Sequence, residues 1–344
     1  MTSLAQQDKK SPPDWVEIVR RYQEPDLRKS IGQLLNSGLP FLAICVLMYF
    51  SLDISYGLTI ALAFLNGLFF MRLFIIQHDC GHNAFFESTK WNNRVGFVLG
   101  IITLTPYYHW RRSHAKHHAG SGDLDFRGFG DVETITVKEF QELSAWAKFR
   151  YRFYRHPFVL FVIGPTLLFA VIHRFPTNLE PNERKERNSV YQTNLGIAAI
   201  FLILGPIIGF WQVLILWLPI IVFSSMIGVY LFYVQHQFED TYWRWHEEWE
   251  YEHAALQGSS FFKLPKILQW FSGNIGFHHV HHLSPKIPNY NLERAHYENE
   301  IFQNVETITI STSIKTIFLD LWDEKTKRLI SFGEYRRRFK GQAA

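Results

Sequence analysis

The chain has 344 residues, of which 47% are hydrophobic and 17% aromatic, and its formal net charge is +4. So small a charge gives no reason to expect a nucleic-acid partner. Mean hydropathy is −0.06 although the chain contains long apolar runs, so apolar blocks must alternate with charged blocks. This alternation is typical of a polytopic membrane protein and excludes an ordinary water-soluble globule.

The first two membrane spans are predicted at 31–51 and 55–76. Residues 1–30 are polar and basic and predict a cytosolic tail followed by a short amphipathic helix. They contain no apolar core of a signal peptide, so the first apolar run should remain as a span. Each of the two runs is long enough to cross a hydrocarbon core of about 30 Å. Basic residues precede the first run and none lies in the turn that follows it, which places the N-terminus inside.

The next segments are shorter and predict membrane-associated elements. Residues 95–108 are apolar but too short to span comfortably, so we expect a re-entrant or interfacial segment broken at Pro106. A polar, basic stretch follows and includes an amphipathic helical pattern from Val137 to about Tyr154. Residues 157–173 are apolar but of marginal length, and we expect them to be half-inserted.

Two further spans are predicted at 195–211 and 213–235. An even number of crossings must separate the later histidine clusters if they share one side of the membrane, and these two spans satisfy that condition. The expected fold is an all-α polytopic membrane protein with about four transmembrane helices and two membrane-associated segments. Its divisions are the tail 1–30, a membrane stem 31–235 with cytosolic insertions, and a cytosolic helical cap 236–344.

Three histidine clusters, HDCGH, HAKHH and HHVHH, each lie close to an apolar run. Histidines spaced i, i+3 or i+4 share one helix face and can hold a common metal. The candidate ligands in the three clusters are His78, His82, His114, His117, His118, His278, His281 and His282. Eight imidazoles are too many for one four-coordinate zinc and suit two iron ions. We therefore predict a His-rich di-iron site held by the cap.

A ninth candidate ligand is His236, in FYVQHQFED at the end of the last span. His279 is the extra member of the third cluster and is expected to point away. Surface, interfacial or supporting roles are expected for His109, His156, His173, His246, His253 and His296. Plausible acceptors for the second ring nitrogen of each ligand are Asp79, Asn83, Asp123, Asp125, Glu239, Asp240 and Asn274. Asn274 lies four residues before His278, and we expect both to face the same way.

At these residues the chain resembles the membrane fatty-acid desaturases, whose three histidine boxes the clusters match. WRRSHAKHHAGSGDLD, FYVQHQFED and GNIGFHHVHHLSPKIPNYNLERAH are similar to the acyl-lipid branch. The likeness is greatest to Gram-positive phospholipid desaturases that insert a cis double bond at Δ5 of saturated acyl chains. It covers roughly residues 25–335.

The resemblance implies an O2-dependent enzyme of the cytoplasmic membrane with two Fe ions, acting on phospholipid acyl chains. Ferredoxin or flavodoxin would supply electrons, and both termini and all histidine boxes would be cytoplasmic. The metal role passes to the eight box histidines and to His236 as the family's ninth histidine. Acyl-CoA-type members place an Asn four residues before that ninth histidine, where this chain has Phe232. The ligand shell here must therefore differ, and Asn274 is one substitute.

Other functions fit the same histidines less well. A di-iron lipid hydroxylase or carotenoid ketolase would share the ligands and differ in where the substrate carbon sits. A metal transporter or sensor would place ligands within the spans, whereas these lie at or beyond span ends. A bis-His haem protein would use pairs on facing spans, and an intramembrane zinc protease would carry HExxH, which the chain lacks.

Overall fold

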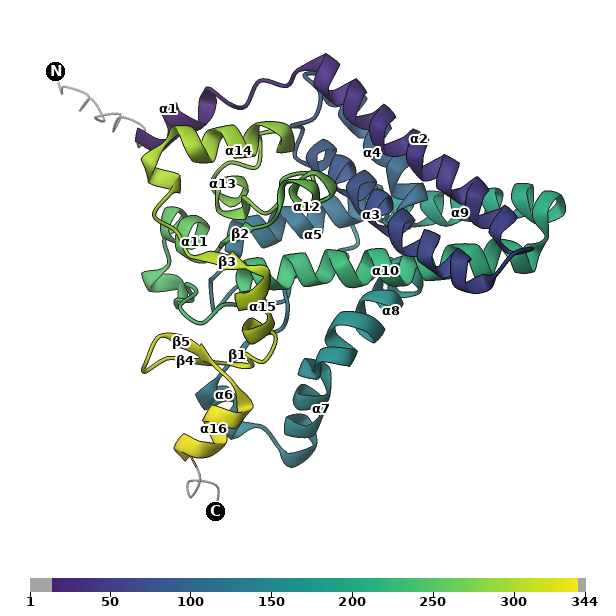
Figure 1. The fold of residues 1–344 in the computed structure, drawn as a ribbon. Coiled ribbons are helices and arrows are strands. Elements are labelled where there is room, and N and C mark those ends of the chain that lie inside the picture. Colours follow the sequence, from purple (N-terminus) through teal and green to yellow (C-terminus); the bar gives the residue numbers. More distant parts are fainter. Residues whose placement is uncertain (1–13, 340–344) are drawn as a thin grey trace.

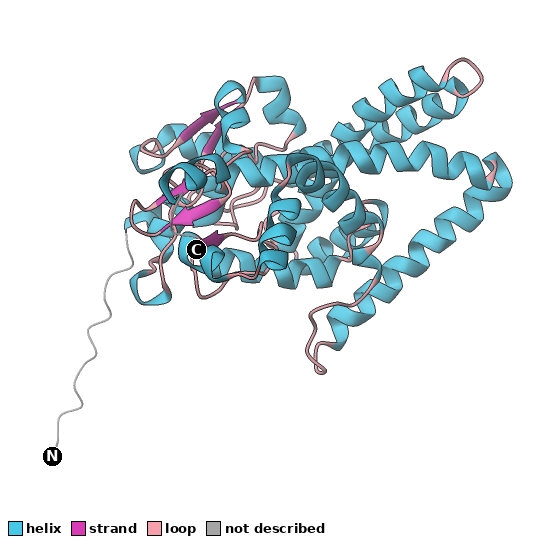
Figure 2. Cartoon of the chain, turned by 90° about the horizontal axis from the view of Figure 1, so that it is seen from below, coloured by secondary structure: helices cyan, strands magenta, loops and turns pink. Residues whose placement is uncertain are grey.

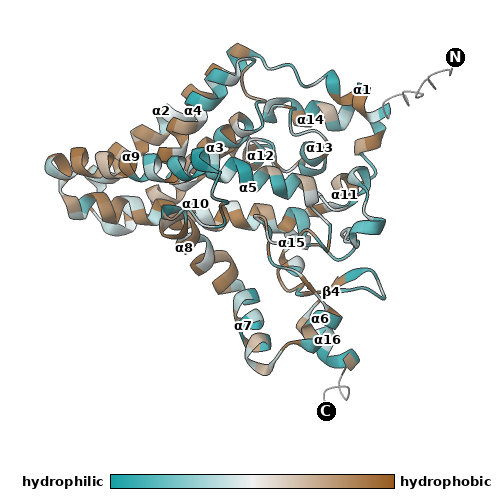
Figure 3. Ribbon diagram, turned by 180° about the vertical axis from the view of Figure 1, so that it is seen from behind, coloured by the Kyte–Doolittle hydropathy of each residue, from teal (hydrophilic) through white to brown (hydrophobic). Residues whose placement is uncertain are grey.

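The computed structural model describes residues 14–339. Residues 1–13 of the predicted tail (1–30) and the end of the chain from Lys340 lie outside the described residues. Long helices form an apolar stem, and shorter helices and strands form a cap at one end of it (Figure 1). Hydropathy divides along the same line, since the stem is predominantly hydrophobic and the cap mixed (Figure 3).

Among residues 14–339, four helices are long and apolar enough to cross a membrane: α2 (Leu27–Ser51), α3 (Tyr56–Gly81), α9 (Arg184–Ile208) and α10 (Phe210–His236). This confirms the prediction of about four spans. α3 extends five residues past its predicted end and α9 begins eleven residues before its predicted start, because both helices continue out of the apolar stretch and into the cap.

The remaining helices are short. They are α1 (Asp14–Arg20), α4 (Thr89–Ile102), α5 (Tyr107–Gly120), α6 (Val137–Glu142), α7 (Ala145–Arg155), α8 (Gly164–Ala170), α11 (Tyr251–Gln257), α12 (Lys266–Phe271), α13 (His278–Leu283), α14 (Asn289–Glu298), α15 (Ile310–Thr316) and α16 (Phe332–Phe339). A π-helix, η1 (Val159–Ile163), and 3-10 turns η2 (Ile172–Arg174), η3 (His246–Glu248) and η4 (Glu300–Phe302) are the other helical elements in the described part of the chain.

Both marginal apolar segments are bent. α4 ends at Ile102, a turn follows, and α5 begins directly after Pro106, the predicted break. α7 and the segment 159–174 form a pair bent by 66°. Pro157 lies at this bend, where its missing N–H favours the end of a helix. Whether the pair crosses the membrane or re-enters it stays a prediction.

Two features of the cap were not predicted. The helical pattern from Val137 to Tyr154 is two helices, because the Ser144 side chain accepts the N–H of Ala147 and starts a new helix. In the described residues, five short strands also form two small sheets, and Figure 2 shows the strands within the cap. Strands β1 (Ile135–Thr136), β4 (Leu321–Asp323) and β5 (Arg328–Ile330) form one, and β2 (Phe261–Lys263) and β3 (Thr307–Thr309) the other.

α3 is the central helix of the stem. It packs against α2, α4 and α10, and its last turns are buried almost continuously from Phe69 to Gly81. The surrounding core includes Met48, Ile76 and Phe85, none of which is more than 1% exposed. This packing carries the end of α3 into the interior of the cap, where the first histidine cluster begins.

Candidate metal centre

The first histidine cluster forms the end of α3. His78 is in the last turn, and His82 is the residue that caps the helix. The one-turn spacing brings the two rings to 4.7 Å, centroid to centroid. Both therefore face the same space at the junction of stem and cap, as their i, i+4 spacing predicts.

The second cluster lies in the last turns of α5. His114 and His118 share one face, with their Nε2 atoms 3.1 Å apart. His117 points to a neighbouring space, and its Nε2 lies 3.3 Å from Nε2 of His282. The HxxHH pattern thus divides its side chains between two groups of histidines.

The third cluster is the short helix α13, all six residues of which are buried. The Tyr251 hydroxyl donates to the carbonyl of His282 at 2.8 Å, and the Gln235 amide donates to the carbonyl of Ile275 at 2.8 Å. These contacts hold a helix that is too short to be stable on its own. They also tie it to the end of α10, where His236 Nε2 lies 2.9 Å from Nε2 of His278.

The nine predicted ligands converge into two neighbouring groups. Within each group, one nitrogen of every side chain lies within 4.8 Å of all the others. The first group is His78, His82, His114, His118 and His281, and the second is His117, His236, His278 and His282. Seven of the nine side chains are buried, whereas His82 and His114 are partly exposed. No carboxylate belongs to either group among the described residues.

The distances between facing nitrogens fit a shared metal. Two nitrogens bound to one metal at about 2.1 Å lie about 3.0 Å apart when the angle at the metal is near 90°. His281 Nε2 lies 3.0 Å from Nε2 of His118, and the His236–His278 pair is comparable. A transition metal is the partner that imidazole nitrogens at these positions suit.

Burial keeps these imidazoles in the form that binds metals. It lowers the pKa well below the ordinary value of 6.5 for His82, His114, His118, His278, His281 and His282, and the neighbouring histidines lower it further. Neutral rings offer a lone pair, whereas imidazolium offers none. The Nε2 atom of His82 and the Nδ1 atoms of His118, His278 and His281 are buried without a hydrogen-bond partner in the described structure.

Comparison with known proteins agrees with this centre. The sequence model of the family described as Fatty acid desaturase matches residues 57–306. A fatty acid desaturase of Bacillus subtilis (strain 168) is 48% identical over 314 residues, which cover 91% of this chain and 89% of that protein. This chain belongs to the fatty acid desaturase family.

More distant relatives in the same family carry more specific names. The sn-1 oleoyl-lipid 12-desaturase of Synechocystis is 29% identical over 65% of this chain and 63% of its own length. The chloroplastic sn-2 acyl-lipid omega-3 desaturase (ferredoxin) of Arabidopsis thaliana is 29% identical over 67% and 52% respectively. This chain thus spans only part of those two proteins. As a fatty-acid desaturase the protein is an oxidoreductase, and its histidine groups indicate a metal site.

Oxygen atoms of the desaturase hold the outer nitrogens of three predicted ligands. Asp79 Oδ1 lies 3.2 Å from Nδ1 of His78, while its Oδ2 accepts the backbone N–H of Asn289 at 2.7 Å. The carboxylate of Asp131 accepts from Nδ1 of His117. The carbonyl of Gly258 accepts from Nδ1 of His236 at 3.1 Å. Such partners fix the tautomer so that Nε2 would be free to bind a metal.

Asp79 was among the predicted partners, but Asp131 and Gly258 were not. Asp131 is the last residue of the glycine-rich sequence GFGD and lies fourteen residues beyond His117. Its only sequence signal is a carboxylate shortly after the second histidine cluster. Gly258 acts through its backbone carbonyl, which carries no signal in side-chain identity.

Several other predicted partners lie elsewhere. Asp123 accepts from Nδ1 of His246 at 2.6 Å, and Asp125 from the backbone N–H of His246 at 2.9 Å. Glu239 pairs with Arg328 at 2.7 Å. Among the other expected partners, Asp240 is exposed, and Asn83 is adjacent to the first cluster with its Oδ1 buried and unpartnered.

The expected orientation of Asn274 was wrong. Asn274 adopts a φ of 57° in the turn before α13, which begins only at His278. A left-handed residue cannot continue a helix face, and the Asn274 amide instead donates to the carbonyl of Asn289 at 3.2 Å. His279 points away from both groups as predicted, with its Nε2 3.0 Å from Nδ1 of His296.

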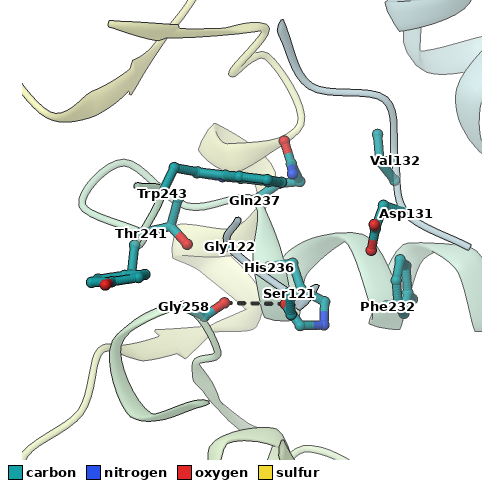
Figure 4. Close-up of a pocket in the computed structure, with 11 residues that line it drawn as sticks. Ser121, Gly122, Asp131, Val132, Phe232, His236, Gln237, Thr241, Trp243 and Gly258 are labelled. Carbon is teal, nitrogen blue, oxygen red and sulfur yellow. Dashed lines mark hydrogen bonds between the residues drawn. The ribbon is translucent and has the colours of Figure 1, made fainter. Parts of the chain in front are cut away.

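A small recess lies beside the second histidine group. It is lined in part by Asp131, Phe232, His236 and Gln237 (Figure 4). The Phe232 ring lies 5.1 Å from the ring of His117 and 5.0 Å from that of His236, centroid to centroid. The position one turn before His236 therefore offers an apolar wall and no ligand oxygen.

Proposed function

We propose that the protein is an O2-dependent di-iron acyl-lipid desaturase. It would introduce a cis double bond, at Δ5, into saturated acyl chains of membrane phospholipids. The observation that carries this proposal is the pair of buried imidazole groups, five side chains in one and four in the other. Each group has at least four nitrogen donors, so each can hold its own ion.

The proposed ions are iron. Imidazole suits iron, copper, nickel and zinc alike. The reaction class excludes zinc, which has no redox chemistry, and iron is the redox-active metal that the resemblance to the membrane desaturases implies. When bound, the iron pair supplies the oxidising power needed to remove two hydrogens from neighbouring carbons, with O2 as the electron acceptor. The proposed ligands are the nine histidines of the two groups defined above.

The chain positions the ligands of that pair, excludes water from them and fixes which nitrogen of each ring is protonated. Seven of the nine ligands are buried, and the Phe232 ring shields the rings of His117 and His236 on one side. Asp79, Asp131 and the Gly258 carbonyl keep a proton on the outer nitrogen of their histidines, which leaves the inner nitrogen free to bind. A site closed in this way limits side reactions with water.

The stem gives an acyl chain a route of approach. Large apolar side chains are exposed along α2 and α9, among them Leu39, Leu42 and Leu202 at 59–64%. In a bilayer these faces contact lipid, so a membrane lipid reaches the protein laterally. Relatives named for oleoyl-lipid and acyl-lipid substrates support the same substrate class.

Localisation and electron supply follow from the same proposal. We place the chain in the cytoplasmic membrane with its cap and both termini on the cytoplasmic side, where basic residues flank the spans. Ferredoxin or flavodoxin would deliver electrons to the cap. One relative carries ferredoxin in its name, which supports the first of these donors.

Acyl-chain analysis tests the proposal. The chain is expressed in a bacterial host that lacks desaturases, and its lipids are analysed by gas chromatography–mass spectrometry after derivatisation. We expect new cis-monounsaturated chains with the bond at Δ5, attached to phospholipid. His281→Ala should abolish them, whereas His253→Ala, which changes a half-exposed histidine outside both groups, should not. Hydroxylated or oxygenated lipid products would instead support a hydroxylase or ketolase.

A further inference from the structure

An open groove lies between α4, α5 and α9. It is open to solvent and is lined by Thr89, Lys90, Asn93, Arg94, Phe97, Tyr108 and Gln192. α4 and α9 pack beside each other (Figure 1). They approach closely at Gly196, where a Cβ would lie 2.7 Å from the Ile101 side chain. The groove occupies the earlier turns of both helices, towards the cap.

The groove is positively charged. Lys90 and Arg94 are exposed on successive turns of α4, and the Lys185 ammonium lies 3.9 Å from the centre of the Tyr108 ring, which forms one wall. None of the described residues lining it is acidic. Neither Lys90 nor Arg94 forms an ion pair with any carboxylate in residues 14–339. The Arg94 guanidinium lies 5.3 Å from the centre of the Trp91 ring, a contact that leaves its N–H groups available to an anion.

The floor of the groove leads towards the metal centre. Asn93 Oδ1 accepts from the Arg111 guanidinium at 3.0 Å and lies 3.4 Å from the Tyr107 hydroxyl. Tyr107 in turn donates to the carbonyl of Cys80 at 2.8 Å, inside the first histidine cluster. The groove is thus connected through Tyr107 to the backbone between His78 and His82.

Arg111 also connects the groove with the two partly exposed candidate ligands. His82 and His114 are the two candidate ligands that are not fully buried. Arg111, three residues before His114 on α5, lies against the same end of α3, since a Cβ on Gly81 would be 3.9 Å from Arg111 Cγ. Arg111 therefore links the groove, through Asn93, to the part of α5 that carries His114.

We propose that this groove binds the phosphodiester headgroup of the substrate glycerophospholipid. The inference rests on the proposed acyl-lipid function and adds the headgroup site to it. Lys90 and Arg94 would donate charge-assisted hydrogen bonds to the phosphate oxygens, with Asn93, Thr89 and Gln192 available to the glycerol and ester oxygens. Binding the headgroup close to the metal centre favours reaction near the carboxyl end of the acyl chain.

The test compares lipids with and without phosphate. Wild type, Lys90→Gln/Arg94→Gln and the control Arg336→Gln/Arg337→Gln are purified with iron in dodecyl maltoside micelles, which contain no phosphate. The control removes the same charge from two exposed arginines of α16. Each protein receives dipalmitoylphosphatidylglycerol or dipalmitoylglycerol, with reduced ferredoxin as donor, and native mass spectrometry of the same micelles counts bound lipid.

We expect the α4 variant to raise the KM for the phospholipid at least about tenfold, the effect of losing one hydrogen bond to a charged group. Its kcat and its kinetics on dipalmitoylglycerol should match wild type, and its bound phospholipid should fall. The α16 control should change nothing.

Two results would overturn the inference while leaving the proposed function standing. They are an unchanged KM for the phospholipid in the α4 variant, and equal wild-type KM values for the two lipids. Desaturation by wild type of palmitoyl-CoA alone, with neither lipid used, would overturn the proposed function and this inference together.

Discussion

Replacing Asp131 with Asn tests how the chain prepares its histidines for metal. Asp131 accepts from Nδ1 of His117, a side chain only 2% exposed, and His117 belongs to the four-histidine group. Asn is nearly the same size but carries no charge, so the variant loses a charge-assisted hydrogen bond while the packing stays. It also permits the wrong tautomer of His117, with the proton on the inner nitrogen.

In the proposed di-iron centre, Asp131→Asn should weaken binding only of the iron held by the four-histidine group, which contains His117. Losing an outer partner of a metal-binding histidine weakens metal affinity about 10–100-fold, which corresponds to about 1.4–2.8 kcal/mol. In a titration with a competing chelator, Asp131→Asn should release its first iron at a 10–100-fold lower chelator concentration than wild type. The second iron, held by the five-histidine group, should leave at nearly the wild-type concentration.

A matched control is Asp125→Asn, since Asp125 accepts the backbone N–H of His246, a residue outside both histidine groups. It should retain both irons as wild type does. Thermal unfolding of each variant shows whether the fold survives. Asp131→Asn with wild-type chelator sensitivity and full desaturation in cells would refute the role assigned to the carboxylate.

Three further outcomes follow from contacts away from the ligands. Arg72→Met removes the donor to Ser37 Oγ at 3.0 Å and to the Trp270 carbonyl, so it should destabilise the protein by about 1–3 kcal/mol for each buried acceptor left without a partner. The control Arg150→Met, on the surface of α7, should not change the stability. Equal melting temperatures for Arg72→Met and wild type would contradict this role of Arg72. His279→Ala should keep both irons but lower the melting temperature, because His296 loses its partner; loss of iron would show that His279 is a ligand. Asp123 and Asp125 raise the pKa of exposed His246 above 6.5, so its stabilisation is full below pH 6.5 and lost as the pH rises through the raised value. The melting temperature of His246→Gln should therefore fall furthest below wild type near pH 6 and least near pH 8.5, and a difference independent of pH would exclude the pairing.

The stem was predictable because membrane physics constrains it strongly. An apolar run of about 20 residues can hardly be anything but a span, and the four long helices lie where those runs lie. Their ends were less predictable. Helix α9 begins at Arg184 and α3 ends at Gly81 because the cap supplies packing partners for their polar turns. The local sequence contains no pattern from which these tertiary contacts can be predicted.

The histidines were predictable for a related reason. Their i, i+3 and i+4 spacings place them on helix faces, and α5 and α13 are indeed helical there. The spacing did not show how His117 and His118, adjacent in sequence, would be divided between two groups. That division depends on how α5 packs against α10 and α13, which is a tertiary property.

Supporting groups were the hardest to predict. Asp131 and the carbonyl of Gly258 reach the centre from loops, and a loop position carries no periodicity. Asn274 shows the opposite error, since counting four residues back from His278 assumed a helix that has not yet begun. The strands were missed because two or three residues are too few for an alternating pattern.

The most direct test of the central claim is the metal content of the purified protein by inductively coupled plasma mass spectrometry, with protein measured by quantitative amino-acid analysis. The two histidine groups predict about two irons per chain after anaerobic loading, and about one for a variant in which His236 and His278 are both replaced by Ala. One metal per chain in the wild type, or zinc in place of iron in an active preparation, would contradict a di-iron centre.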